Sequence, residues 1–365
     1  MIAKIYPNGH AELNGKQHPV RYFDIRKLTE RECLRLMDVS EKDIDTLTSC
    51  PKLTRSALYK MAGNSIVVSC LYHIFKNIYC GSKSEPSLFD ETNFQVSPPQ
   101  TIRMVTLCSG YDSQVMAMQR LAHKLNKSVD LVFWSEFDPD SNKPQNEQPS
   151  VIAHNTLFPQ WSERNLGDMT KIDWDSVECK EEIDMLTYST PCTSISQAGR
   201  REGIAKGSGT RSSILWYTEN AIRALRPKFL LQENVKALCN KVNAPHFNQW
   251  LQVCNDLGYD NYWAVLNAKD YGVPQNRERV FMLSVRRDLG LQTYHFPKPF
   301  PLQGKVADVL EDVTEQIYFL SPTNVIKFLQ MNETDKAAHI VYAQTDHKLT
   351  DEEINFYRNG QREDT

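Results

Sequence analysis

The stretch IRMVTLCSGYDSQ, residues 102–114, joins an apolar run to a glycine-containing turn and then to a helical segment beginning near Val115. A strand that enters a helix through such a turn is typical of an alternating α/β domain. The turn offers backbone N–H groups and the positive end of a helix to an anionic ligand group. One glycine does not make a GxGxxG motif, so an ordinary tight turn stays an equal alternative at this point.

Further apolar runs continue the pattern towards the C-terminus. Most have the length and continuity of parallel strands covered on both faces, and the last two, on either side of a Gly- and Arg-containing loop, indicate an antiparallel pair. The expected strands are 102–108, 130–135, 183–189, 228–234, 262–268 and 279–285. We therefore expect an α/β fold with a mostly parallel, Rossmann-like sheet.

A helix and a linker are expected ahead of this sheet. Residues 28–39 predict a helix in which Thr29 is the N-cap and Glu32 its capping-box partner. The Ser- and Pro-containing stretch at 81–100 has few periodic apolar residues and predicts a linker.

A second helix is expected directly before the linker. Apolar residues recur at helical spacing between residues 66 and 78, and Asn64 or Ser65 is expected to open this amphipathic helix as N-cap.

The composition indicates a soluble globular protein of 365 residues. No apolar stretch reaches the roughly 18 to 20 residues of a membrane span, and the N-terminus lacks a signal-peptide core. Nine cysteines without a CxxC pair favour a reducing compartment over a disulfide scaffold or zinc site, so we expect a cytoplasmic protein without metal. The net charge of -3 does not indicate nucleic-acid binding. Its distribution is uneven, however, because the N-terminal 84 residues are basic and the C-terminal 69 acidic.

Acidic residues follow the expected strands at similar positions. Glu136 could accept hydrogen bonds from ribose hydroxyls, Phe137 could stack on a nucleobase, and Asp168 could accept from an exocyclic amino group. Each alone is more often a solvated acid at a strand end. In chain order, they predict a nucleoside-containing cofactor lying across the strand ends.

Two other strand ends carry a candidate nucleophile and a candidate acid. Pro191-Cys192 closes the run IDMLTYSTPC, and Glu233-Asn234 closes FLLQENV. A thiol attacks only as thiolate, and a carboxyl group donates a proton near neutral pH only if its pKa is raised, so each needs a partly desolvated site. Such a pair suits addition of sulfur to an electron-poor ring.

Basic residues surround these strand ends. Residues 199–211 hold four glycines and four basic residues, which indicates a basic loop able to close over a polyanion, with a solvated loop as the alternative. Arg277 and Arg279 lie two apart at a strand entry, so both could reach one ligand, unless they belong to a surface Arg–Glu network.

Taken together, these motifs resemble those of the DNA (cytosine-5)-methyltransferases, and they follow the family's order over residues 102–285. The matching elements are CSG (motif I), EFD (II), GDM (III), TPCTSIS (IV), QENV (VI) and QNRER (VIII). Residues 26–39 resemble motif IX and residues 58–75 motif X, which in the family normally follow the target-recognition region. The resemblance therefore implies a circularly permuted chain.

The resemblance also implies a domain organisation. It consists of a split target-recognition region (1–24 and 296–365), motifs IX and X (25–80), a linker (81–100) and an S-adenosylmethionine-binding catalytic domain (101–295). The C-terminal part is short and acidic, which is unfavourable for duplex DNA. Either the N-terminal part makes the DNA contacts, or the recognition region is incomplete in this chain.

The implied reaction is methylation of C5 of a flipped-out cytosine in double-stranded DNA. Cys192 adds to C6, Glu233 binds the N3 edge, Arg279 binds O2, and C5 takes the methyl group of S-adenosyl-L-methionine, leaving S-adenosyl-L-homocysteine. Arg277 holds adjacent backbone or the loop. The implied catalytic residues are Cys192, Glu233, Arg277 and Arg279, and the implied DNA-side residues are Thr193, Ser196, Gln275 and Asn234. No metal takes part.

The implied cofactor-binding residues are Cys108, Ser109, Gly110, Tyr111, Glu136, Phe137, Asp168, Met169, Pro191, Asn64 and Ser65. The sequence departs from the family where Asp112 and Ser113 replace two glycines of motif I, and where Cys108 replaces a phenylalanine. These changes make the geometry of the cofactor turn less certain than the catalytic assignment.

Two other functions are compatible with these motifs. One is methylation of tRNA cytosine by the same fold, and the other is DNA binding without catalysis. The expected protein is a monomer in the cytoplasm, associated with the nucleoid if it is bacterial or phage-borne, and it acts with a cognate restriction endonuclease or as an orphan enzyme. A dehydrogenase is disfavoured because GxGxxG is absent.

Overall fold

The computed structural model describes residues 2–13, 16–81, 94, 96–191, 204–313, 315–319 and 342–344, with backbone alone for 2–25, 316 and 342–344. Contacts divide the chain into two compact units. Unit 1 consists of Met1–Cys33 and Gly304–Thr365, and unit 2 of Leu34–Gln303.

Unit 2 is built on a six-stranded sheet in the order β4-β3-β5-β6-β8-β7. Its strands are β3 (Thr101–Leu107), β4 (Ser128–Ser135), β5 (Met185–Tyr188), β6 (Phe229–Val235), β7 (Tyr259–Asn267) and β8 (Glu278–Arg286). The first four, β3 to β6, are parallel to one another, while β8 pairs antiparallel with both β6 and β7. The mostly parallel α/β sheet and its antiparallel last pair are thus confirmed.

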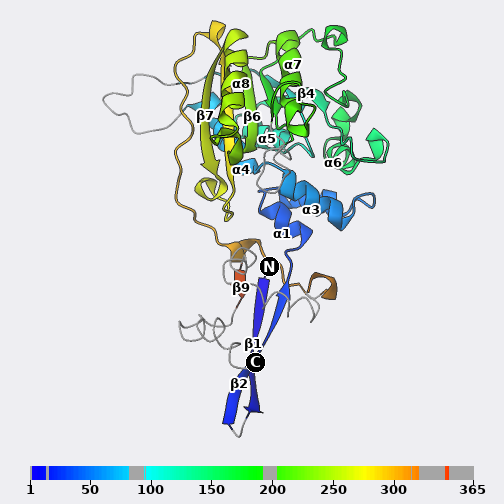
Figure 1. Ribbon diagram of the computed structural model, residues 1–365, viewed down its shortest axis with the longest axis vertical. Helices are drawn as coiled ribbons and strands as arrows, with labels where there is room; N and C mark the ends of the chain where they lie inside the picture. The colour runs from blue at the N-terminus through cyan, green and yellow to red at the C-terminus, as the bar shows by residue number, and fades with distance from the viewer. Residues whose placement is uncertain are drawn as a thin grey trace, which may run out of the picture. The chain divides into compact units, whose positions relative to one another are not determined.

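Helices cover both faces of this sheet (Figure 1). The helices of unit 2 are α2 (Glu41–Thr48), α3 (Arg55–Asn64), α4 (Val68–Cys80), α5 (Ser113–Lys124), α6 (Pro149–Leu157), α7 (Thr218–Leu225) and α8 (Ala244–Asp256), of which α3 lies at the end of the sheet. Shorter 3-10 segments include η4 (Arg211–Tyr217) and η6 (Ala268–Tyr271). Side chains alternate along β6: Phe229 contacts Tyr79 of α4, whereas Leu230 joins the hydrophobic cluster that contains Trp250 of α8. Strands buried on both faces explain the continuous apolar runs.

The corner between α3 and α4 differs from the prediction. Asn64 is the last residue of α3 and Ser65 is its C-cap, whereas α4 begins at Val68 with Val67 as an N-cap that makes no side-chain bond. The assignment of Asn64 or Ser65 as N-cap of the second helix was therefore wrong. Asn64 and Ser65 end the helix α3, whereas they were expected to begin the next helix.

The expected linker is partly anchored to the core. Phe94 is buried, and its ring meets those of Phe229 and Tyr294 edge to face at centroid distances of 6.4 and 5.1 Å. The Val96 N–H also donates to the Ile78 carbonyl. Residues 82–93 and 95 lie outside the described part of the chain.

Unit 1 contains a long hairpin that the sequence analysis did not predict. β1 (Ile2–Leu13) and β2 (Lys16–Arg26) pair antiparallel, and β9 (Tyr342–Gln344) pairs parallel with β1. The Asn14-Gly15 dipeptide between the two strands is the sequence signal for such a hairpin.

The helix α1 (Glu30–Arg35) confirms the predicted capping box. The Thr29 N–H donates to Glu32 Oε2 at 2.7 Å, and the Glu32 N–H donates to Thr29 Oγ1 at 3.1 Å. Glu32 also forms a buried two-point ion pair with Arg26, whose two Nη atoms each lie 2.8 Å from a carboxylate oxygen. The helix is shorter than expected, since the residues after Arg35 form a turn.

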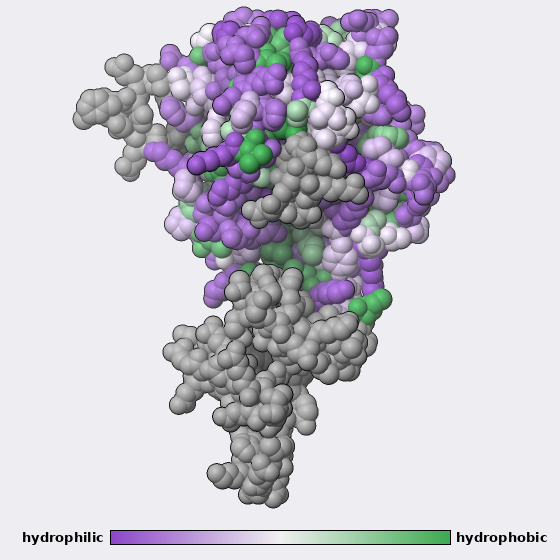
Figure 2. All heavy atoms as spheres, viewed as in Figure 1, coloured by the Kyte–Doolittle hydropathy of each residue, from purple (hydrophilic) through white to green (hydrophobic). Residues whose placement is uncertain are grey.

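The surface of unit 2 on the face shown in Figure 2 is mainly hydrophilic, with hydrophobic residues scattered in small groups. Within the described ranges, no helix is long and apolar enough to cross a membrane. The described residues also contain no cluster of three or more His, Cys, Asp or Glu side chains that could hold a metal ion.

Candidate active site

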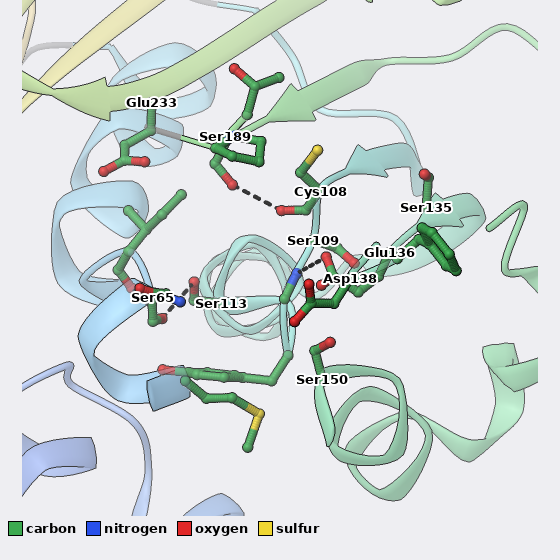
Figure 3. Close-up of a pocket in the computed structure, with 18 of the residues that line it drawn as sticks. Ser65, Cys108, Ser109, Ser113, Ser135, Glu136, Asp138, Ser150, Ser189 and Glu233 are labelled. Atoms are coloured by element: carbon green, nitrogen blue, oxygen red, sulfur yellow. Dashed lines mark hydrogen bonds between the residues drawn. The ribbon is translucent and has the colours of Figure 1, made fainter. Parts of the chain in front are cut away.

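A cavity of about 310 Å³ lies at the carboxyl ends of the parallel strands in unit 2. Figure 3 shows side chains converging on it from the ends of β3, β4, β5 and β6 and from the α3–α4 corner. The predicted residues that line it are Asn64, Ser65, Cys108, Ser109, Gly110, Tyr111, Glu136, Phe137, Asp168, Met169, Pro191, Glu233, Asn234, Arg277 and Arg279. Gln275 is not among the lining residues. Cys192, Thr193 and Ser196 lie outside the described residues.

The turn after β3 has an unusual backbone. Cys108, Gly110 and Asp112 all have positive φ, at 52°, 59° and 68°. The Gly110 N–H donates to Glu136 Oε2 at 2.9 Å (Figure 3). Burial raises the pKa of Glu136, and hydrogen bonds from Gly110 and Ser150 oppose that rise. The carboxylate expected to bind ribose thus also fixes the turn.

Asp112 shows how the chain tolerates a non-glycine residue in this left-handed position. Its carboxylate accepts from the Val115 N–H at 3.2 Å, capping α5, and from Thr106 Oγ1 at 2.7 Å. Nε2 of His154 lies 3.6 Å from Oδ2, the same oxygen that accepts from Thr106, and the side chains of Asp112 and His154 are both fully buried. Local hydrogen bonding of this kind is what allows aspartate to adopt a conformation that most residues avoid. The replacement of glycine is therefore compensated by side-chain contacts.

The segment between α6 and β5 carries two other predicted cofactor-side residues, Asp168 and Met169. Asp168 Oδ1 accepts from the N–H and the hydroxyl of Thr170, at 3.0 and 2.7 Å. Burial alone would raise the pKa of Asp168, but the bonds from Thr170 and Lys171 outweigh it and lower that pKa. Cys108 Sγ lies 3.3 Å from the Met169 sulfur, on the cavity wall.

On the opposite side of the cavity, Glu233 pairs with Arg279. Arg279 Nε lies 3.1 Å from Glu233 Oε1, and the glutamate side chain is only 10% exposed. Burial raises the pKa of Glu233, while Arg279 and then Arg277 oppose that rise. A buried carboxyl group with a raised pKa beside a guanidinium is suited to exchange a proton with a bound ligand.

The strands that lead to Pro191 and Glu233 are neighbours in the sheet, as the sequence predicted. Asn234 joins their ends, because its Nδ2 donates to the Thr190 carbonyl at 3.1 Å and its Oδ1 accepts from the Val235 N–H at 2.9 Å. This amide holds the backbone immediately before Pro191.

Arg277 and Gln275 belong to the loop between β7 and β8. Arg277 Nη2 donates to the carbonyls of Gly63 and Ser65, at 2.9 and 2.6 Å. The Gln275 carbonyl accepts from the Arg277 N–H at 3.1 Å, so its backbone shapes this loop. Arg277 and Arg279 share the cavity but differ in their partners.

Three charged residues that line the cavity were missed by the sequence analysis as site residues. They are Lys60 of α3, Asp138 and Arg211 of η4. Asp138 Oδ2 accepts a hydrogen bond from Lys60, and Asp138 Oδ1 accepts one from Arg211, both at 3.2 Å. Asp138 belongs to the EFD motif and Arg211 ends the basic loop, so both lay within segments already singled out. Lys60 has no comparable signal in the sequence.

A family model described as C-5 cytosine-specific DNA methylase matches residues 3–80 and 102–363, which is most of the chain. This protein belongs to the C-5 cytosine-specific DNA methylase family. It is 40% identical over 162 residues to the type II methyltransferase M2.ScrFI of Lactococcus lactis subsp. cremoris, covering 44% of each chain. It is 35% identical over 202 residues to the orphan methyltransferase M.SssI of Spiroplasma monobiae, covering 53% of this chain and 50% of that protein.

The chain spans about half the length of the curated relatives that it matches. Among solved structures, the Dnmt2 methyltransferase of S. pombe is similar with a TM-score of 0.42 at 17% identity, over 62% of this chain and 65% of that one. Family membership agrees with the resemblance inferred from the motifs.

Proposed function

We propose that this methylase family member transfers a methyl group from S-adenosyl-L-methionine to C5 of cytosine in double-stranded DNA. The observation that carries the proposal is that one cavity contains both the Glu136–Gly110 turn and the Glu233–Arg279 pair. Pro191 lines the same cavity and directly precedes Cys192 in the sequence. A methyl donor and a target base bound at these two groups would be neighbours.

The polar lining of the cavity fits the proposed cofactor. The hydroxyls of Ser109 and Thr190 are buried and have no hydrogen-bond partner within the described part of the chain, so they can serve a ligand. Glu136 provides a carboxylate for ribose hydroxyls, Phe137 an aromatic face, and Asp168 an acceptor beside Met169. Cys108, Gly110, Tyr111, Pro191, Asn64 and Ser65 complete the proposed wall. When bound, S-adenosyl-L-methionine supplies an electrophilic methyl group.

The proposed chemistry on the base is carried by three residues. The Cys192 thiolate adds to C6, and the electron pair of the C5–C6 bond becomes available at C5. Glu233 donates a proton to the N3 edge, and Arg279 stabilises charge at O2. After methylation, loss of the C5 proton to a base restores the C5–C6 double bond and expels the thiolate, and N3 returns its proton to Glu233. Thr193, Ser196 and Gln275 are proposed to lie along the DNA.

The proposed activity is tested by incubating the protein with tritiated cofactor and either duplex DNA or tRNA. We expect label in DNA, and duplex carrying 5-fluorocytosine should form a covalent adduct because its C5 substituent cannot leave as a proton. The Cys192→Ser variant should form none. Label in tRNA alone would contradict the proposed substrate, and DNA binding without an adduct would indicate a non-catalytic protein.

Bisulfite sequencing of DNA from an expressing host would then give the sequence context of the modified cytosines. The matched relatives include both type II and orphan methyltransferases. Such a map would therefore decide whether a partner endonuclease with the same recognition site should be sought.

We also propose that the chain is circularly permuted relative to the usual motif order, with motifs IX and X at 26–39 and 58–75. The proposal is supported by the α3–α4 corner, because Asn64 and Ser65 line the cavity beside the turn that follows β3. Ser65 Oγ lies 3.3 Å from Ser113 Oγ at the start of α5 (Figure 3). Proximity in space is what allows a chain to be reconnected.

In a rearranged variant, residues 1–80 are removed from the N-terminus and attached after residue 365 through a flexible linker. This variant should still bind S-adenosyl-L-homocysteine. Calorimetric titration of the rearranged and original proteins measures this directly. A folded rearranged protein that does not bind the product would contradict the proposed permutation.

A further inference from the structure

The α3–α4 corner, Gly63–Ser65, forms one wall of the cavity, although it is over 200 residues from β8 in the chain. The end of a helix leaves its last carbonyl groups without partners inside the helix. At this corner, the Ser65 N–H bonds to the Ala62 carbonyl, while the Gly63 and Ser65 carbonyls face outwards from the helix end.

Arg277 binds both of these outward carbonyls with one nitrogen, at 2.9 and 2.6 Å. A cation is stabilised at the carboxyl end of a helix because the aligned peptide dipoles are negative there. The acceptors are backbone atoms, which every residue type provides. The identity of residue 277 therefore decides whether the contact exists.

The same corner is held from two further directions. Ser65 Oγ lies 3.3 Å from Ser113 Oγ, on the helix that follows the cofactor turn. Ser69, in the first turn of α4, donates to the Tyr271 carbonyl in the loop that also carries Arg277. The β7–β8 loop thus fixes both the end of α3 and the start of α4.

Within the described part of the chain, Arg279 bonds to groups outside this corner. Its Nε faces Glu233 at 3.1 Å, and its Nη1 donates to the Glu278 carbonyl at 2.8 Å. Arg277 and Arg279 therefore line one cavity but contact different parts of its wall. Arg277 binds the Gly63–Ser65 corner and Arg279 binds Glu233.

We propose that Arg277 is a positioning residue for the cofactor wall, and not a group that contacts the target base. It holds the Gly63–Ser65 corner against the turn after β3 and so shapes the pocket for the methionine portion of the cofactor. The inference rests on the proposed function. The family resemblance implies that Arg277 holds adjacent backbone or the loop, and the proposal assigns it instead to the Gly63–Ser65 corner.

The matched pair Arg277→Gln and Arg279→Gln tests this assignment. Binding of S-adenosyl-L-homocysteine, measured by calorimetry without DNA, should weaken about tenfold in Arg277→Gln, because a charge-assisted bond to the wall is lost. The Arg279→Gln variant should bind the product within about twofold of the wild type while its kcat falls, since its partner is the acid Glu233. Arg277→Lys should recover part of the affinity, because it keeps the charge.

The assignment is overturned if Arg277→Gln binds S-adenosyl-L-homocysteine like the wild type and only its KM for DNA rises, which would indicate a phosphate contact. Should Arg277→Gln fail to fold, Arg277→Lys carries the comparison, since an unchanged affinity and kcat in that variant would likewise exclude a positioning role for the guanidinium. Failure of the wild-type protein to bind S-adenosyl-L-homocysteine at all would instead refute the proposed function.

Discussion

Replacing Glu233 with glutamine is expected to lower kcat by about 10²- to 10⁴-fold, the usual contribution of a positioned general acid. The carboxyl group is buried, paired with Arg279, and has a raised pKa, so it can hold a proton at N3 while the thiolate adds at C6. Glutamine keeps the shape and a hydrogen-bond donor but has no proton to transfer. Single-turnover methyl transfer to duplex DNA measures the loss.

The pH dependence separates this role from a structural one. Because Glu233 acts in its protonated form, wild-type kcat should fall as pH rises through its raised pKa. That limb should be missing from the residual activity of Glu233→Gln. Glu278→Gln is a suitable control, since Glu278 is exposed on β8 and pairs with Lys236 outside the cavity. An unaltered pH profile in Glu233→Gln would contradict the assignment.

Replacing Arg26 with methionine is expected to destabilise unit 1 by about 3–5 kcal/mol, the usual effect of leaving a buried charge unpaired. Arg26 is 5% exposed and Glu32 fully buried, so the loss of the guanidinium leaves the carboxylate without its charged partner. Among the described residues, the carboxylate would keep the N–H groups of Thr29 and Glu311 as donors. Hydrogen exchange of the amides in β2 and α1 measures the loss locally.

A double variant is the control for this prediction. Arg26→Met with Glu32→Gln removes both charges, and the new amide oxygen can still accept from the Thr29 N–H. It should therefore be more stable than Arg26→Met alone. All six tryptophans lie between residues 134 and 263, so their fluorescence reports on unit 2 as an internal reference. Equal exchange rates in the single and double variants would show that the buried charge is not the cause.

Much of the fold was predictable because its signals are local or periodic. Continuous apolar runs identified all six strands of unit 2, and the spacing of Thr29 and Glu32 identified the capping box. The neighbouring ends of β5 and β6, and with them the proximity of Pro191 and Glu233, followed from the parallel sheet. These features depend on residue type and short separations, which the sequence displays directly.

Other features have no such signal. The N-cap of α4 is Val67, which makes no side-chain bond, so the polar residues Asn64 and Ser65 before it were mistaken for the cap. Phe94 is a single aromatic residue in a Ser- and Pro-containing stretch, and its partners Phe229 and Tyr294 are distant in the chain. Their contacts could not be predicted from composition.

The candidate site was predictable to a similar extent. Many of its lining residues were identified from motif resemblance, but Lys60, Asp138 and Arg211 were missed. The partners of Arg277 were not predicted either, because every residue has a backbone carbonyl and the sequence does not show which of them is an acceptor. The roles of Cys192, Thr193 and Ser196 stay predictions, since these residues lie outside the described part of the chain. Most of the predicted C-terminal recognition segment does as well.

The separation between Arg277 and the corner it holds has a consequence for how the protein is made. Residues 63 and 65 leave the ribosome more than 200 residues before their partner. Until residue 277 has been synthesised, the nascent chain has the corner and the turn after β3. It still lacks the arginine side chain that holds the corner in place. Contacts of such long sequence separation form late. Ligand binding, which stabilises only the assembled state, can therefore assist the folding of this pocket only after Arg277 has been synthesised.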